Sequence, residues 1–292
     1  MAETNTAADV IAAHRASGYF FEAGGVKSFA LDMGEGPALL CLHGVPTSSF
    51  LYRKVLKRLQ EQGFRGVSFD FPGLGLAGRP EDFDYSFKGL TKFSLKAVEA
   101  LKLDKFHLVV HDIGGPIGFA LAAQLKDRIS SITILNTWID VVNFSKPLPM
   151  QPFSVPLVDK LELALITHKT WELAFSNVAV SDTSGISKAE MDAYVDLLKR
   201  EDDGAAFLKI MKGFDHSEEF RDLCYKAVQQ VPYPVQAIWG ADDPGLTLER
   251  YGREIQEVAG LKEVQQLSAK HLLQEDQWQE IADRIVRQAK QV

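Results

Sequence analysis

Asp112 is the residue whose surroundings most clearly indicate chemistry. An apolar run over residues 106–110 has the pattern of a buried strand, and it continues through His111-Asp112-Ile113-Gly114-Gly115 into an apolar helical segment. A strand, a tight turn and a helix in this order present one side chain at the tip of the turn. The Asp112 carboxylate is ionised at neutral pH, so it could displace a leaving group from saturated carbon and form a covalent ester.

Two further groups follow Asp112 in an order typical of a catalytic triad. Asp242 and Asp243 come after an apolar run over residues 235–239, and His271 lies between a short strand pattern and the last helix pattern. Taken alone, Asp112 is better explained as a helix N-cap, a position that aspartate favours. The order of nucleophile, acid and histidine favours the catalytic interpretation over the capping one.

The elements expected around these residues alternate between strand and helix. Period-two patterns and short apolar runs predict strands over 19–21, 26–31, 38–42, 65–70, 106–110, 129–135, 235–239 and 264–267. Helical spacing predicts helices over 50–59, 86–103, 115–125, 246–259 and 274–289. This alternation is typical of a parallel sheet with crossover helices. Such a sheet would bring the loops that carry Asp112, Asp242-Asp243 and His271 to one edge.

Residues 141–216 interrupt the alternation and predict a helical cap. The segment has four prolines near its start and helical patterns without a strand pattern between them, and Ser187 and Glu190 form a capping box. We therefore expect a core of residues 17–140 and 217–292, a helical cap over 141–216, and an N-terminal extension over 1–16 that packs loosely.

Six segments together resemble the α/β-hydrolases, in the branch that contains haloalkane dehalogenases and epoxide hydrolases. They are His43-Gly44-Val45-Pro46-Thr47-Ser48-Ser49, Asp70-Phe71-Pro72-Gly73-Leu74-Gly75, Val110-His111-Asp112-Ile113-Gly114-Gly115, Leu135-Asn136-Thr137-Trp138, Trp239-Gly240-Ala241-Asp242-Asp243-Pro244 and His271-Leu272-Leu273-Gln274-Glu275-Asp276. The resemblance implies the α/β-hydrolase fold: a mostly parallel central sheet, helices on both faces and a helical lid inserted after the sixth strand.

The resemblance also implies roles for particular residues. Asp112 would be the nucleophile, His271 the base that activates water, and Asp243 the acid that holds the imidazole, although Asp242 could exchange roles with Asp243. The backbone N–H groups of Ile113 and Val45 would stabilise the oxyanion. A reaction of this kind requires no metal and no organic cofactor; its partners are a small-molecule substrate and water.

The sequence departs from both named activities at the leaving group. Haloalkane dehalogenases usually carry tryptophan where Ile113 stands, and one subgroup carries asparagine where Val45 stands. Trp138 or Trp171 could supply a donor instead, or could simply pack in the interior. Epoxide hydrolases use a pair of lid tyrosines, and between residues 141 and 216 only Tyr194 is present.

These observations favour a haloalkane dehalogenase-like hydrolase that acts on a small to medium apolar substrate through a covalent alkyl-enzyme ester. An epoxide hydrolase is the first alternative. A non-hydrolytic, ligand-binding member of the fold is the second, because fold alone does not fix function.

The composition is that of an ordinary folded protein. Of 292 residues, 32 are Lys or Arg and 39 are Asp or Glu, and the resulting net charge of −7 opposes binding to nucleic acid or to anionic membranes. Cys41 and Cys224 have no metal-binding spacing, and we expect both to be buried. No signal-peptide pattern and no apolar run of about 18 residues is present, so we expect a cytoplasmic protein with no membrane partner.

Overall fold

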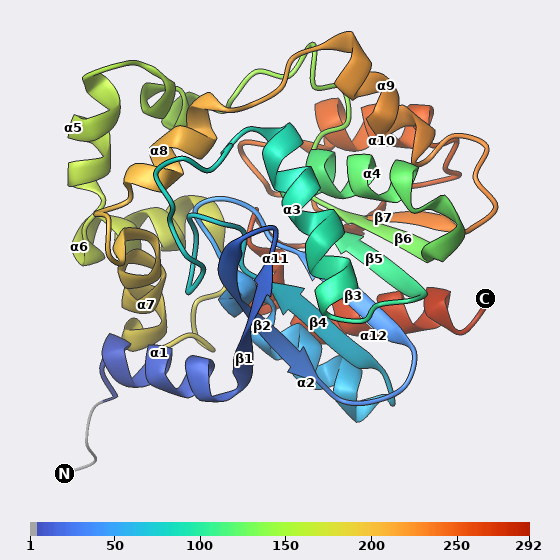
Figure 1. Ribbon diagram of the computed structural model, residues 1–292, viewed down its shortest axis with the longest axis horizontal. Helices are drawn as coiled ribbons and strands as arrows, with labels where there is room; N and C mark the ends of the chain where they lie inside the picture. Colours follow the sequence, from blue (N-terminus) through green and yellow to red (C-terminus); the bar gives the residue numbers. More distant parts are fainter. Residues whose placement is uncertain (1–4) are drawn as a thin grey trace.

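The computed structural model describes residues 5–292 and is centred on one eight-stranded sheet (Figure 1). The strand order is β1-β2-β4-β3-β5-β6-β7-β8. The pairs β1/β2 and β2/β4 are antiparallel, and the six strands from β4 to β8 in this order are parallel. The strands are β1 Gly18–Ala23, β2 Val26–Met33, β3 Ala38–Leu42, β4 Arg65–Phe69, β5 Phe106–Val110, β6 Ile129–Leu135, β7 Val235–Gly240 and β8 Gln265–Leu267.

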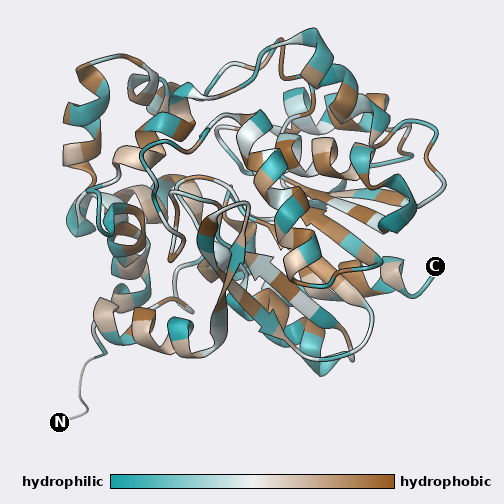
Figure 2. Ribbon diagram, viewed as in Figure 1, coloured by the Kyte–Doolittle hydropathy of each residue, from teal (hydrophilic) through white to brown (hydrophobic). Residues whose placement is uncertain are grey.

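All eight strands that the sequence predicts are therefore present. Every residue of β5 and β6 is buried, because helices cover both faces of the sheet at its centre. Figure 2 shows the same division: the central strands are mainly hydrophobic, whereas the helices alternate between hydrophilic and hydrophobic residues. The free cysteines Cys41 and Cys224 are both buried, as expected.

Helices form a layer on each face of the sheet. One layer contains α2 (Arg53–Glu61) and α12 (Trp278–Ala289), which pack against each other. The other contains α3 (Phe87–Ala100), α4 (Gly114–Gln124), α9 (Glu218–Lys226) and α10 (Arg253–Val258) (Figure 1). Within residues 5–292, no helix has both the length and the apolar character needed to cross a membrane.

Two expected helices are divided in the structure. The pattern over 246–259 forms a π-helical turn at Leu248–Gly252 that continues into α10. The pattern over 274–289 forms a short helix α11 (Leu273–Asp276) and then α12, because Gln277 between them has φ −116° and leaves helical geometry.

The insertion after β6 is helical, as the sequence predicts. It contains α5 (Val158–Leu165), α6 (His168–Ala174), α7 (Lys188–Lys199) and α8 (Ala205–Lys212), with short turns between them. Figure 1 places these helices together at one end of the sheet. The exact limits of a cap at residues 141 and 216 stay a prediction.

The N-terminal extension differs from the prediction of loose packing. Residues Ala7–Ala16 form helix α1, whose first turn is closed by a capping box between Thr6 and Asp9. The helix lies against α7 (Figure 1). It is fixed by His14, which is buried between the rings of Phe29 and Phe50. The part of the extension before residue 5 lies outside the described residues.

Candidate active site

Asp112 lies at the tip of the turn between β5 and α4. Its φ of 52° is left-handed, a conformation that aspartate tolerates better than most residues. The turn is held from the neighbouring strand end, where Asp112 N–H donates to the Asn136 carbonyl at 3.0 Å and the Thr137 hydroxyl donates to the Asp112 carbonyl at 2.6 Å. A side chain at Gly44 would collide with the Asp112 carboxyl group, so only glycine allows this close approach.

One of the two expected backbone donors, that of Val45, contacts the Asp112 carboxyl group. Val45 N–H donates to Asp112 Oδ1 at 2.8 Å. Ile113 is the residue before the first turn of α4, where backbone N–H groups have no partner within the helix. The structure thus fixes one carboxylate oxygen and leaves the other, Oδ2, toward the histidine.

His271, in the loop between β8 and α11, connects the two carboxylates. Its Nε2 lies 3.6 Å from Asp112 Oδ2, and its Nδ1 lies 2.7 Å from Asp243 Oδ2. Asp242 instead is exposed and accepts a hydrogen bond from Ser268 Oγ at 3.3 Å. The geometry therefore pairs His271 with Asp243 and leaves Asp242 outside the site.

Asp243 is buried, and neighbouring groups hold its carboxylate in place. Its Oδ1 accepts from the backbone N–H groups of Gly245 and Leu246 at 2.8 and 3.0 Å. Asn136 donates from Nδ2 to Asp243 Oδ2 at 2.8 Å and accepts at Oδ1 from Gly240 N–H at 2.8 Å. Sequence reasoning had not assigned this role to Asn136. Its position directly after β6, beside β7 in the sheet, is the signal that could have found it.

The charges of the site stabilise one another. Burial acts to lower the pKa of His271, but the charge of Asp243 and the contacts with Asp112 outweigh it and raise that pKa to about 10. Burial acts to raise the pKa of Asp243, and the His271 charge and hydrogen bonds lower it to about 2. The pKa of Asp112 is also lowered, chiefly by His271 against the opposing effect of burial. The free protein at neutral pH therefore holds an imidazolium between two carboxylates.

Two histidines beside the site make structural hydrogen bonds. His111 donates from Nε2 to the His271 carbonyl at 2.9 Å, and burial together with the His271 charge lowers its pKa to about 3. His43 donates from Nδ1 to the Gly44 carbonyl at 2.9 Å and accepts at Nε2 from Phe71 N–H at 3.1 Å. Both rings are fully buried.

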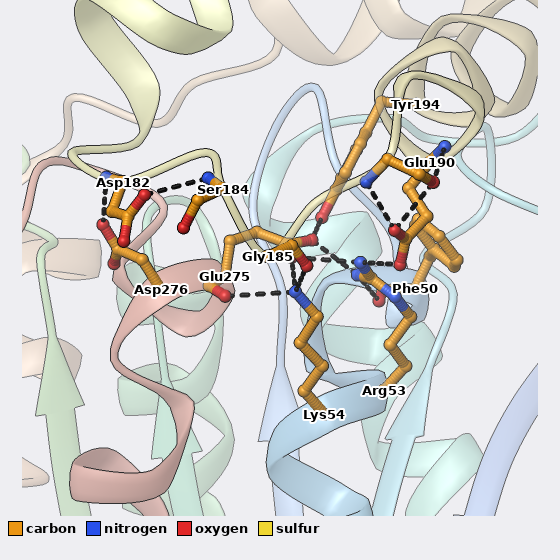
Figure 3. Close-up of polar contacts among 11 residues, drawn as sticks. Phe50, Arg53, Lys54, Asp182, Ser184, Gly185, Glu190, Tyr194, Glu275 and Asp276 are labelled. Atoms are coloured by element: carbon orange, nitrogen blue, oxygen red, sulfur yellow. Dashed lines mark hydrogen bonds and ion pairs between the residues drawn. The ribbon is translucent and has the colours of Figure 1, made fainter.

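The candidate leaving-group donors differ in what they contact. Trp138 is buried and stacks on Phe144 at 3.8 Å between ring centroids, and Trp171 lies in α6. The indole N–H groups of both are buried and have no acceptor within residues 5–292. Tyr194, in contrast, donates its hydroxyl proton to Glu275 (Figure 3). A buried carboxylate requires donors, so Tyr194 is engaged there and does not serve a leaving group in this arrangement.

The stability of the protein is expected to be highest near pH 6.5. Burial lowers the pKa of His14 and His107 to about 4 and, with the His271 charge, that of His111 to about 3, so below pH 6.5 protons bind the unfolded chain first. By pH 4 each such histidine lowers the free energy of unfolding by about 3 kcal/mol. Burial lowers the pKa of His43 as well, whereas it raises the pKa of Glu254 to about 7 and also raises that of Asp276, so two groups oppose four. Above pH 6.5 the folded state keeps the His271 proton up to pH 10, so stability falls again.

Urea unfolding at pH values from 4 to 9.5 measures this profile. In His271→Gln the decline between pH 7 and 9.5 should flatten, while the decline below pH 6.5 should remain. An unchanged alkaline decline in that variant would contradict the assignment of the raised pKa to His271.

No cluster of three or more His, Cys, Asp or Glu side chains suited to a metal ion occurs in the described part of the chain, residues 5–292. The site geometry is built entirely from the two carboxylates, the imidazole and backbone N–H groups. What it can do chemically is attack an electrophile with Asp112 and move a proton at His271.

The family model for the alpha/beta hydrolase fold matches residues 37–277. The chain therefore belongs to the alpha/beta hydrolase fold family. The match includes the Asp112, Asp243 and His271 loops together with the helical insertion.

Relatives agree with the branch that the motifs resemble. Haloalkane dehalogenase 2 of Mycobacterium tuberculosis is 39% identical over 108 residues, which are 37% of this chain and only 37% of that protein's length. A haloalkane dehalogenase of Mycolicibacterium paratuberculosis is 27% identical over 266 residues, covering 88% of this chain and 85% of that one. A solved epoxide hydrolase from Vigna radiata superposes with a TM-score of 0.75 at 18% identity, covering 94% and 98% of the two chains.

Proposed function

We propose that this chain is a haloalkane dehalogenase-like hydrolase that uses Asp112 as its nucleophile and His271 as the base that activates water. The observation that carries the proposal is the position of the Asp112 carboxylate between Val45 N–H on one side and the His271–Asp243 pair on the other. The named activities of the relatives support a hydrolase.

In the first step, Asp112 attacks the carbon that bears the leaving group. Val45 N–H holds Oδ1, so Oδ2 is the attacking oxygen. A new C–O bond forms, the carbon–halogen bond breaks, and the halide departs with the bonding electrons. His271 need not remove a proton in this step, because the carboxylate is already ionised.

In the second step, His271 activates water against the ester. Forming the ester removes the negative charge of Asp112, which is one of the contacts that raise the pKa of His271. The imidazole then loses its proton more readily, takes one from water, and the water oxygen attacks the Asp112 carbonyl carbon. Oδ1 becomes the oxyanion beside the N–H groups of Val45 and Ile113. When it collapses, the bond between the carbonyl carbon and Oδ2 breaks, the departing alkoxide takes the proton of the newly added hydroxyl and leaves as the alcohol, and Oδ1 with the water oxygen forms the restored carboxylate.

Trp138 is our candidate donor for the departing halide, with Trp171 as the comparison. Its buried indole N–H has no acceptor within residues 5–292, and it directly follows Thr137, which bonds the Asp112 carbonyl. A buried N–H without an acceptor is unfavourable, so the Trp138 indole is stabilised when it donates a hydrogen bond to a departing halide. Trp138→Phe should slow ester formation from a bromoalkane by roughly tenfold to a hundredfold. Rapid-quench measurement of bromide release tests this, and an effect of Trp171→Phe alone would transfer the role to Trp171.

The test of the proposed function is turnover of the purified protein with separate bromoalkanes and epoxides. We expect bromide release from one or more bromoalkanes, with Asp112→Asn as the control that should give none. Diol formation from epoxides without bromide release would favour an epoxide hydrolase. Tight binding of the compounds without any product would favour a non-hydrolytic member of the fold.

A further inference from the structure

The residues on either side of His271 are bound by the helical insertion. Lys270 donates from Nζ to the Ser176 carbonyl at 3.0 Å, and Leu272 N–H donates to the Ala179 carbonyl at 2.7 Å. Ser176 and Ala179 belong to the π-helical turn Phe175–Ala179 that follows α6. The peptide bond between His271 and Leu272 is thus held from both sides: its N–H by the insertion and its carbonyl by His111 of the core.

Asp276, at the end of α11, makes a second connection to the insertion. Its Oδ2 accepts from Ser181 N–H at 3.0 Å and from Asp182 N–H at 3.1 Å. Figure 3 shows the contact between Asp182 and Asp276 beside the contacts of Glu275. Residues 270–276, which carry the histidine, therefore lie along residues 176–182 of the insertion.

Charged and polar side chains from the core helix α2 and from the insertion helix α7 contact Glu275. Its carboxylate is fully buried. It receives Arg53 Nη2 at 3.0 Å and Lys54 Nζ at 3.0 Å from α2, together with the Tyr194 hydroxyl from α7 (Figure 3). Tyr194 is held in turn by its ring contacts with Phe50, Trp171 and Phe175.

Arg53 extends the cluster to the start of α7. Its Nη2 donates to Glu190 Oε1 at 2.8 Å, and Glu190 Oε2 accepts from Ser187 N–H at 2.8 Å in the capping box of that helix. Arg53, Lys54, Glu190 and Glu275 balance as two positive and two negative charges. Separating the insertion from the His271 loop would break the Arg53–Glu190 pair and the Tyr194–Glu275 hydrogen bond, and a buried charge that loses a partner is costly.

We propose that Tyr194, Glu275 and Arg53 are positioning residues that hold the His271 loop against the insertion and so align His271 for ester hydrolysis. The inference rests on the proposed function. In that mechanism ester formation uses Asp112 without a base, whereas ester hydrolysis needs the imidazole correctly placed toward water. Loosening the contacts should therefore slow the second step and spare the first.

Tyr194→Phe is the primary test, because it removes one hydroxyl and keeps the packed ring. With a bromoalkane that the protein turns over, rapid-quench intact-mass measurements give the rates of ester formation and ester hydrolysis separately. We expect formation within about twofold of the unaltered protein and hydrolysis about tenfold slower. Glu275→Gln, which keeps the shape and removes the charge, should change the same ratio in the same direction.

The matched control is Tyr233→Phe. Tyr233 is also buried and donates its hydroxyl to a backbone carbonyl, that of Ala227 at 2.9 Å, at the opposite end of β7 from the site. Its loss should lower stability without changing the ratio of the two rates. Equal slowing of both steps in Tyr194→Phe, or no change in their ratio, would overturn the proposal.

Hydrogen exchange gives a readout that needs no substrate. In Tyr194→Phe the peptide that contains Leu272 should exchange faster than in Tyr233→Phe, because the insertion holds its N–H less firmly. Unchanged exchange there would overturn the proposal even if no substrate reacts. Failure of the proposed function is recognised separately: neither the unaltered protein nor His271→Gln would then form an ester.

Discussion

Asp112→Asn is expected to abolish turnover while leaving the fold intact. The amide is neutral and a poor nucleophile, but it has the same shape, and its carbonyl oxygen can still accept from Val45 N–H. Loss of a nucleophile of this kind lowers the rate on the order of 10⁴-fold or more. Product release under steady-state conditions measures the loss, and circular dichroism verifies the fold.

Asp242→Asn is the matched control for this variant. It makes the same chemical change at an exposed carboxylate in the loop that also carries Asp243. Turnover should stay within about twofold of the unaltered protein. More than a tenth of normal activity in Asp112→Asn would mean that another group performs the attack.

His271→Gln is expected to separate the two steps. Asp112 should still react and release one equivalent of bromide, because its carboxylate needs no base. Hydrolysis of the ester should slow by about 10³-fold or more, since no imidazole remains to take the proton from water. Rapid mixing should therefore show a burst of one bromide per protein followed by almost no turnover. Continued turnover after the burst would contradict the role of His271.

Much of the fold follows from local patterns. The fully buried strands β5 and β6 have the continuous apolar sequences expected of a sheet covered on both faces. Strand ends at one edge of a parallel sheet lie together, so chain order brought Asp112, the Asp242-Asp243 pair and His271 into one hypothesis, and the family resemblance then favoured Asp243. The Asp242 alternative stayed open because adjacent residues in a turn cannot be distinguished by pattern.

What the sequence could not predict depends on contacts between distant segments. Arg53 and Glu275 are separated by 222 positions, and nothing near either residue indicates the other. The helix α1 illustrates the same point: a weakly apolar segment becomes ordered because α7 and the pocket around His14 provide its partners. Asn136 lies between these cases: the sequence predicts its place after β6, but not that its side chain would bind the Asp243 carboxylate.

Intact-protein mass spectrometry of His271→Gln, after exposure to separate bromoalkanes, epoxides and simple esters, tests the central claim most directly. The account predicts that a bromoalkane adds one alkyl group in place of one hydrogen, and that the double variant Asp112→Asn/His271→Gln gains no mass. A folded His271→Gln protein that gains no mass from any compound, or an adduct that persists in the double variant, would contradict Asp112 as the nucleophile.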